Sequence, residues 1–362
     1  MKFVIGLFLV LSLQITLSAQ ESEVRTLINT TCIHDALFES DEIFVICLKG
    51  DLRKLFNDRR GETSYHPILM SYILPNGKTD SLKIRVKTRG HFRRKRENCK
   101  IPPLLLRFDS IQSQSNNLFT GQNKIKLVTP CVDHKYVLRE YLIYKIHQLL
   151  SANSFHVRLV KLCFEDSVKG GKTEEKYAIL LENHNLLADR LHAKLFKRLN
   201  TRPQIILREE FLNMSVFQYL IGNTDWSVQY LHNIKLMIQK DKHGLVPVPY
   251  DFDHAGLVNA PYAKPIEELR MVSVRQRRYR GYCIKNMEEF QPTFDLFNRL
   301  KTDIYAIYIN NPLLEKKYIK QSLKYLVEFY QTINNPKLAA KAFQYPCSPF
   351  GTGNVVIKGL KD

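Results

Sequence analysis

The sequence predicts an α+β protein with two lobes, a strand-rich N-lobe over residues 20–182 and a mainly helical C-lobe over residues 183–362. Short segments with an apolar residue at every second position dominate the first half, a pattern typical of half-buried strands. Apolar residues at helical spacing dominate the end of the chain. With 362 residues and 44% hydrophobic content, the chain can bury a large core, and it contains no internal repeat.

Residues 1–19 have the organisation of a secretory signal peptide. Lys2 is followed by the apolar run from Phe3 to Leu13, and Ala19 precedes the charged segment. We expect cleavage after Ala19 and a secreted or periplasmic protein, with an uncleaved anchor as the alternative. No later segment approaches the ~20 apolar residues of a spanning helix, so we expect no integral membrane span after signal removal.

The formal net charge of +19 favours anionic partners such as nucleotides, acidic proteins, lipid head groups or anionic glycans. We do not expect nucleic acid as a partner, because the basic residues are spread out and form no recognisable binding motif. The charge alone does not distinguish a protein partner from an envelope component.

The sequence has seven cysteines, so at least one is unpaired or bridges two chains. Cys99 and Cys131 both lie in polar, loop-like surroundings, and we expect them to pair. Cys163 lies inside an apolar strand, where we expect a buried thiol. No Cys-x-x-Cys motif or His/Cys cluster indicates zinc.

The N-lobe begins with a predicted strand at 43–47 and a short helix at 51–57. Residues 82–89 carry a basic residue at every second position, which predicts a strand with a cationic outer face. The basic segment from Arg89 to Lys100 follows, and residues 104–108 form the next strand. Gly90 and the dense Arg and Lys residues could cover an anion, although a solvated basic loop explains the composition equally well.

A strand at 124–128 precedes a helix at 136–150, which we expect to be largely buried against a sheet. A strand lysine followed by a helix glutamate is the arrangement that positions nucleotide phosphates in kinases, so Lys124 or Lys126 with Glu140 is a candidate pair. A surface lysine and a helix-face glutamate would give the same pattern.

Residues 156–164 and 176–182 predict a hairpin. The second strand ends at Glu182 and passes to a short helix at 186–190. Backbone groups at such a connection could bind adenine, as could those of any strand-to-helix connection.

The most informative stretch runs from Ile221 to Asp253. A helix over 211–221 ends at Gly222, and residues 234–238 and 245–250 predict a second hairpin. Oxygen-bearing side chains gather on the loop and at the ends of the hairpin, namely Asp225, Asn233, Asp251 and Asp253. This is the composition of a Mg²⁺ site, with helix capping or structural Ca²⁺ as the alternative.

Beyond this stretch, residues 275–283 are strongly basic and include two tyrosines. They could contact a substrate or phosphate, but a solvated helix face is the more frequent explanation of such a run. Residues 287–300 and 312–334 predict helices, the latter with an apolar stripe that belongs to the core.

The order of these features resembles that of protein kinases, which place a loop Asp, a metal-binding Asn and a strand-end Asp in sequence. Asp225 and Asn233 are eight positions apart, wider than the ordinary kinase signature, so a kinase here would be atypical. Over roughly residues 80–255 the chain resembles the CotH family of atypical protein kinases. The similar motifs are Arg89-Gly90 followed by Lys100 and the strand at 104–108, Leu138-Arg139, the strand at 177–182 ending in Glu, Asn223-Thr-Asp225, His232-Asn233 and Pro249-Tyr-Asp-Phe-Asp253.

The resemblance implies a two-lobed atypical protein-kinase-like fold that transfers a phosphoryl group from ATP, with Mg²⁺, to an acceptor that we expect to be protein Ser or Thr. Asp225 would act as the catalytic base, and Asn233, Asp251 and Asp253 would hold the metal. The expected nucleotide-binding residues of the N-lobe are Arg89, Lys100, Lys124, Lys126, Glu140 and Glu182.

Two other functions remain compatible with the sequence. One is an inactive, kinase-like envelope protein that binds an anionic ligand, and the other is nucleotidyl transfer, or phosphorylation of a sugar or lipid head group, on the same fold. Ser-His-Asp hydrolysis is not favoured, because the chain has no Gly-x-Ser-x-Gly elbow.

Overall fold

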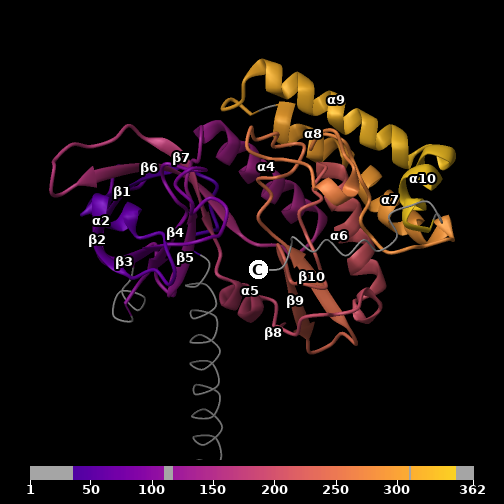
Figure 1. Cartoon of the computed structure of the whole chain (residues 1–362), viewed down its shortest axis with the longest axis horizontal. Coiled ribbons are helices and arrows are strands. Elements are labelled where there is room, and N and C mark those ends of the chain that lie inside the picture. The colour runs from indigo at the N-terminus through magenta and orange to yellow at the C-terminus, as the bar shows by residue number, and fades with distance from the viewer. Residues whose placement is uncertain (1–35, 110–116, 310, 348–362) are drawn as a thin grey trace, which may run out of the picture.

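The computed structural model describes residues 36–109, 117–309 and 311–347 (Figure 1). The expected signal peptide and Cys32 lie outside these residues. The described chain is a mixed α/β protein with a strand-rich N-terminal part and a largely helical C-terminal part. None of the described helices combines the length and the apolar character needed to cross a membrane.

Seven strands of the N-lobe close into a barrel with the order β1-β2-β3-β4-β5-β7-β6. They are β1 (Phe44–Gly50), β2 (His66–Ile73), β3 (Thr79–Thr88), β4 (Leu104–Arg107), β5 (Lys124–Val128), β6 (Val157–Asp166) and β7 (Lys176–Leu181). The parallel pairing of β1 with β6 closes the barrel, and the other pairs are antiparallel. Alternate residues fill the interior, which is why β2 and β3 alternate between buried and more exposed side chains.

Two helices belong to this part of the chain, α2 (Leu52–Asn57) and α4 (His134–Leu150). Asp51 caps α2 through a hydrogen bond from the Lys54 amide. Helix α4 lies between the barrel and the C-lobe (Figure 1), where ten of its residues are buried. It therefore belongs to the same apolar cluster as the C-lobe core, while the barrel interior forms a second cluster.

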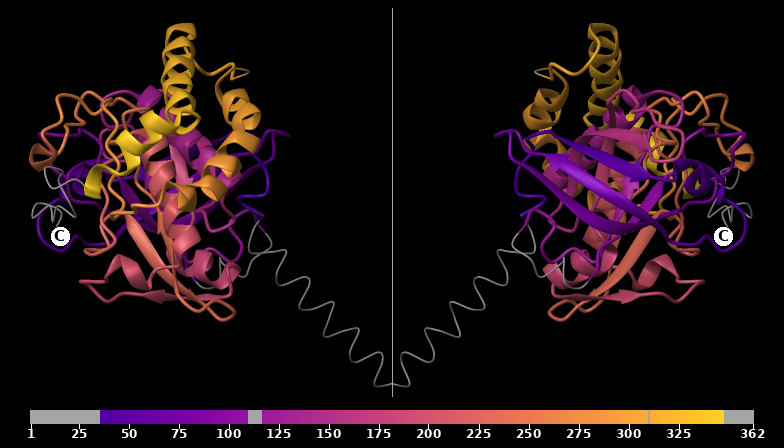
Figure 2. Two further views of the ribbon diagram at one scale, coloured as in Figure 1. Left: turned by 90° about the vertical axis from the view of Figure 1, so that its right-hand side faces the viewer. Right: turned by 90° about the vertical axis from the view of Figure 1, so that its left-hand side faces the viewer.

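The C-lobe combines helices with a small antiparallel sheet of order β10-β9-β8. Its elements are α5 (His184–Arg190), β8 (Ala193–Phe196), α6 (Arg208–Ile221), β9 (Ile234–Gln239), β10 (Leu245–Pro249), α7 (Gln291–Arg299), α8 (Lys301–Ile309), α9 (Lys316–Ile333) and α10 (Pro336–Phe343), with short 3₁₀ turns at Pro203–Ile205, Glu267–Leu269, Met287–Phe290 and Tyr345–Cys347. Helix α9 lies at one end of this lobe and the sheet at the other (Figure 1, Figure 2). The predicted hairpin of β9 and β10 is confirmed, whereas β8 was not predicted.

Three disulfides tie distant segments together. The predicted Cys99–Cys131 bridge is confirmed, and Cys283 pairs with Cys347. The expectation of a free thiol at Cys163 is wrong, because Cys163 bridges to Cys47. These two cysteines lie directly opposite each other in the parallel β1–β6 pair, a register that the local pattern of either strand cannot reveal.

The basic cluster at 275–283 does not form the solvated helix face that was the more frequent explanation of such a run. The Arg277 guanidinium instead donates hydrogen bonds to the carbonyl oxygens of Leu220 at 3.2 Å and Tyr325 at 2.6 Å. It thereby joins the end of α6 to α9, and α6 leads directly to the Asp225 loop.

The end of α6 generates a prediction. Gly222 has φ of 68°, and a Cβ there would lie 2.1 Å from the Tyr325 hydroxyl, whereas Gly77, with φ of 81°, has open space around it. We expect Gly77→Ala to lower the free energy of unfolding by about 1–2 kcal/mol for the left-handed backbone alone. Gly222→Ala should lose more than about 3 kcal/mol, because Tyr325 must also move. Urea denaturation of both variants measures the difference, and equal losses would contradict this packing.

Candidate active site

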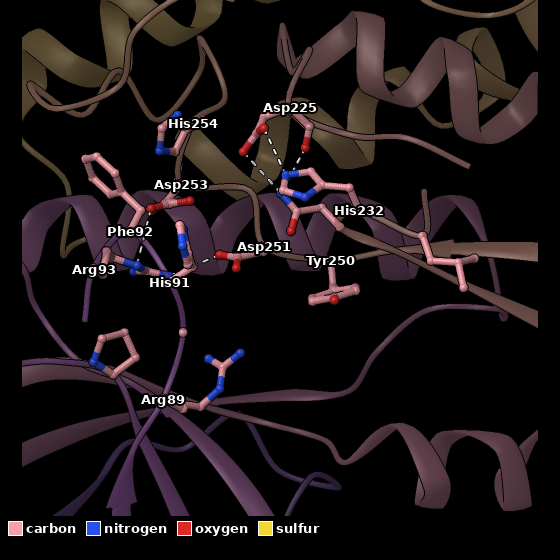
Figure 3. Close-up of a pocket in the computed structure, with 14 residues that line it drawn as sticks. Arg89, His91, Phe92, Arg93, Asp225, His232, Tyr250, Asp251, Asp253 and His254 are labelled. Carbon is pink, nitrogen blue, oxygen red and sulfur yellow. Dashed lines mark hydrogen bonds and ion pairs between the residues drawn. The ribbon is translucent and has the colours of Figure 1, made fainter. Parts of the chain in front are cut away.

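A cavity of about 260 Å³ lies where the barrel meets the C-lobe (Figure 3). The barrel contributes the loop after β3, residues 89–93, and the C-lobe contributes Asp225, residues 231–233 and the segment that follows β10. Of the residues predicted for the site, five line this cavity, namely Arg89, Asp225, Asn233, Asp251 and Asp253. The stretch from Ile221 to Asp253 therefore converges as expected on one side of the cavity.

The backbone around Asp225 is fixed from several directions. The Asp225 amide donates to the Asn223 Oδ1 atom at 3.0 Å. The half-buried Arg280 guanidinium donates to the carbonyl oxygens of Thr224 and Trp226, the latter at 2.6 Å. Because these carbonyls flank Asp225, Arg280 holds the loop that presents the carboxylate. Sequence analysis did not identify this role, since Arg280 is one of several arginines in a basic run.

The Asp225 carboxylate is engaged on both oxygens. Oδ1 lies 3.0 Å from the His232 Nε2 atom, and Oδ2 accepts a hydrogen bond from the side-chain Nδ2 atom of Asn233 at 3.2 Å. Burial raises the pKa of Asp225, but the His232 hydrogen bond and the nearby charge of His254 lower it, and the net pKa lies below the usual value. Asp225 is therefore an ionised acceptor at neutral pH.

Phe252 determines the direction of the two aspartates beside it. Its ring is fully buried, with its centroid 4.8 Å from that of Tyr144 on α4 and 5.5 Å from that of Phe217 on α6. Asp251 has φ of 63° and its amide donates to the Tyr144 hydroxyl at 2.9 Å. With Phe252 anchored in the core, both aspartates face the cavity (Figure 3).

Arg93 lies among three carboxylates. Its Nη2 atom is 3.0 Å from Asp251 Oδ1, its Nε atom is 3.3 Å from Asp253 Oδ2, and its Nη1 atom is 3.7 Å from Glu140 Oε2. The Arg93 side chain is only 7% exposed. Sequence analysis did not single out Arg93, because a run of arginines and lysines does not show which member is buried.

Burial and these neighbours shift the three carboxyl groups differently. Burial raises the pKa of Asp251, but Arg93, Arg89 and Lys126 outweigh it, so the net pKa is lowered. For Asp253, the effect of burial exceeds the opposing effect of the Arg93 charge, so the pKa of Asp253 is raised. Burial is also the main cause of the rise in the pKa of Glu140 to about 8, against the opposing effect of Arg93.

The other predicted N-lobe residues lie in different places. Lys126 lies beside the cavity, with Nζ 4.5 Å from the centre of the ring of Tyr250, a lining residue, whereas Lys124 is exposed on the same strand. The candidate pair of Glu140 with one of these lysines is not formed, since the ion pair of Glu140 in the described chain is with Arg93. Both lysines belong to β5, whereas Arg93, in the loop between β3 and β4, contacts Glu140.

Lys100 and Glu182 do not line the cavity within the described residues. Lys100 is exposed, and its carbonyl oxygen accepts from Arg59. Glu182 is buried and accepts from Arg190 at 2.9 Å and from the His156 amide at 2.9 Å. This saturated carboxylate fixes the connection between β7 and α5.

The donor chemistry of the site fits Mg²⁺ that arrives with a nucleotide. No three His, Cys, Asp or Glu side chains of the described ranges are arranged to hold a metal ion by themselves. Magnesium, however, commonly takes one or two carboxylates and completes its shell with phosphates and water. Asp251 and the Asn233 amide oxygen are hard donors on the cavity wall, so they fit such an ion but not a pre-formed protein cage.

No protein-family model and no curated protein matches the chain. Among solved structures, the proinflammatory kinase CtkA of Helicobacter pylori aligns at 14% identity and a TM-score of 0.36, covering 60% of this chain and 90% of that one. A Golgi casein kinase aligns at 11% identity and a TM-score of 0.30, covering 84% of this chain and 77% of that one. At these TM-scores the similarity to two kinases carries no argument of its own.

The position of Glu140 predicts a pH dependence. Between its ordinary pKa of 4.5 and its raised pKa of about 8, the folded state binds a proton that the unfolded state has released, so the contribution of Glu140 to stability falls as pH rises. Glu140→Gln cannot ionise. Its free energy of unfolding relative to wild type should therefore increase across this range, by up to about 1.4 kcal/mol per pH unit.

Urea denaturation in the presence of a chelator measures this trend, with the exposed Glu174→Gln as the matched control. A difference between Glu140→Gln and wild type that does not change with pH would contradict the raised pKa of this buried carboxyl group.

Proposed function

We propose that the chain is an atypical kinase that transfers the γ-phosphoryl group of ATP to a hydroxyl acceptor, with protein Ser or Thr as the expected substrate. The observation that carries the proposal is the convergence of Asp225, Asn233 and Asp251 on one cavity, with Arg89 on the opposite wall. Phosphoryl transfer requires mainly positioning and charge stabilisation, and this cavity offers acidic and basic groups on facing walls.

Each residue has a role in this proposal. Asp225 is ionised and held by His232 and Asn233, so it can orient the acceptor hydroxyl and take its proton late in the transfer. Asn233 and Asp251, with Asp253 beside them, would hold Mg²⁺, which when bound neutralises the charge of the nucleotide phosphates. Arg89 lines the cavity and Lys126 lies beside it, over Tyr250, where both can balance the phosphates from the barrel side.

Export of the protein is part of the proposal. The expected signal peptide motivates it, and the three disulfides among the described residues support it, because disulfides persist in oxidising compartments.

The proposal predicts the effect of removing one carboxylate at a time. Asp251→Asn and Asp225→Asn should each lower phosphate transfer at least about 100-fold, because one removes a metal ligand and the other the proton acceptor. Asp241→Asn, an exposed residue between β9 and β10, should match wild type.

The assay follows label from γ-labelled ATP into the chain itself and into a Ser/Thr peptide library. Full activity in folded Asp251→Asn would exclude this site. Label transferred from α-labelled ATP instead would indicate nucleotidyl transfer.

A second candidate, an anion-binding protein without catalysis, is favoured by the outer face of the barrel. Basic residues lie opposite one another on three adjacent strands, since Arg85 pairs with Arg107 and Arg107 with Lys124. Like charges in such positions are destabilising. Of these three, Arg85 alone forms an ion pair within the described chain, with Asp109. This crowding of charge suits a surface that binds a polyanion.

The second candidate predicts metal-independent binding. The triple variant Arg85→Gln, Arg107→Gln, Lys124→Gln should bind inorganic polyphosphate at least about tenfold more weakly than wild type in the absence of Mg²⁺. The charge-matched control Lys316→Gln, Lys317→Gln, Lys320→Gln alters exposed residues of α9 and leaves β3, β4 and β5 unchanged. Calorimetric titration measures the affinity of each variant for polyphosphate. Equal affinities of the triple variant and the control would exclude the barrel face as the anion site.

A further inference from the structure

The Arg93 guanidinium occupies a position that a cation would take in a phosphoryl-transfer site. It lies 3.0 Å from Asp251 and 3.3 Å from Asp253, the residues expected to bind metal (Figure 3). It also lies 3.7 Å from Glu140 on α4. Protein kinases hold two Mg²⁺ ions on a strand-end Asp and a loop Asn, the roles proposed here for Asp251 and Asn233. Arginine keeps its charge at any working pH, so this internal cation is permanent.

The charges of this cluster leave a place for one further divalent ion. Because Glu140 is protonated at neutral pH, Asp251 and Asp253 around one guanidinium carry one excess negative charge, which attracts a further cation. The second Glu140 oxygen, Oε1, is buried and has no hydrogen-bond partner within the described chain, so the cluster is not saturated by Arg93.

The surrounding loop holds Arg93 in place. The Cys99–Cys131 disulfide closes the loop at one end, and Arg59 donates to the carbonyl oxygen of Cys99 at 2.7 Å. Next to Arg93, the Phe92 ring packs on His254 and Tyr262, with centroid distances of 5.5 Å and 5.8 Å. Removal of Arg93 from the cluster would break these contacts, so the guanidinium is a fixed part of the site.

The two aspartates differ in what they can offer to an ion. Arg93 engages both carboxylates, Asp251 at 3.0 Å and Asp253 at 3.3 Å, and both residues line the cavity. The Asp253 side chain is only 8% exposed, whereas the Asp251 side chain is 31% exposed. Of the two, Asp251 is therefore the more accessible to a ligand.

We propose that Arg93 replaces one of the two metal ions of such a site, so that the nucleotide-loaded chain binds a single divalent ion, on Asp251 and Asn233. This inference rests on the proposed function and changes the expected role of Asp253 from metal ligand to counter-ion of Arg93.

The test is the number of Mn²⁺ ions bound per chain in the presence of a non-hydrolysable ATP analogue, counted by electron paramagnetic resonance. Wild type should bind one ion. Arg93→Met, which keeps the length of the side chain but removes its charge, should bind two. Arg96→Met, an exposed neighbour on the same loop, should bind one. Arg93→Lys keeps a cation and should also bind one, which provides a second variant if Arg93→Met does not fold.

The outcomes separate the two proposals. Two ions in wild type, or one ion in a folded Arg93→Met, would overturn the replacement of a metal by Arg93 and leave the proposed function intact. No nucleotide-dependent Mn²⁺ binding in wild type would overturn both. A second readout needs no nucleotide: Mn²⁺ should raise the melting temperature of Arg93→Met more than that of wild type, and equal shifts would contradict the proposal.

Discussion

The ion pairs of Arg93 join the two lobes at the cavity. The arginine comes from the barrel, Glu140 from the helix between the lobes, and Asp251 and Asp253 from the C-lobe. Loss of one partner from a buried ion pair typically costs roughly 3–5 kcal/mol, because the remaining charge is left uncompensated. The shape of the cavity therefore depends on this guanidinium together with Phe252, which anchors the segment that carries both aspartates.

Charge is divided between the two walls of the cavity. The C-lobe provides Asp225, Asp251 and Asp253, and the barrel provides Arg89 with Lys126 beside it. Burial lowers the pKa of Lys126 well below its usual value, and the neighbouring Arg89 and Lys235 lower it further. An anionic ligand between the walls would relieve this repulsion, and a cation carried with that ligand would meet the acidic wall. Both needs are met by a magnesium nucleotide.

Local patterns predicted those parts of the structure that local interactions determine. The end of α6 at Gly222 follows from backbone conformation, and the β9–β10 hairpin follows from alternation and turn residues. Their proximity in sequence is why the stretch from Ile221 to Asp253 could be identified as one site.

Contacts between distant segments could not be predicted in the same way. Closure of the barrel through β1 and β6, and with it the Cys47–Cys163 bridge, depends on a register between strands more than a hundred residues apart. The partner of Glu140 was assigned to the wrong segment, because only the three-dimensional path of the loop shows that Arg93 is the buried member of the basic run.

The most direct test of the account is the melting temperature of the wild-type protein with ATP, measured with and without Mg²⁺, since a ligand that binds only the folded state raises stability. We predict a clear rise with ATP and Mg²⁺ together, a much smaller rise with ATP alone, and loss of the Mg²⁺-dependent part in Asp251→Asn. A rise that is the same with and without Mg²⁺, or no rise at all, would contradict a magnesium-nucleotide site at Asp251.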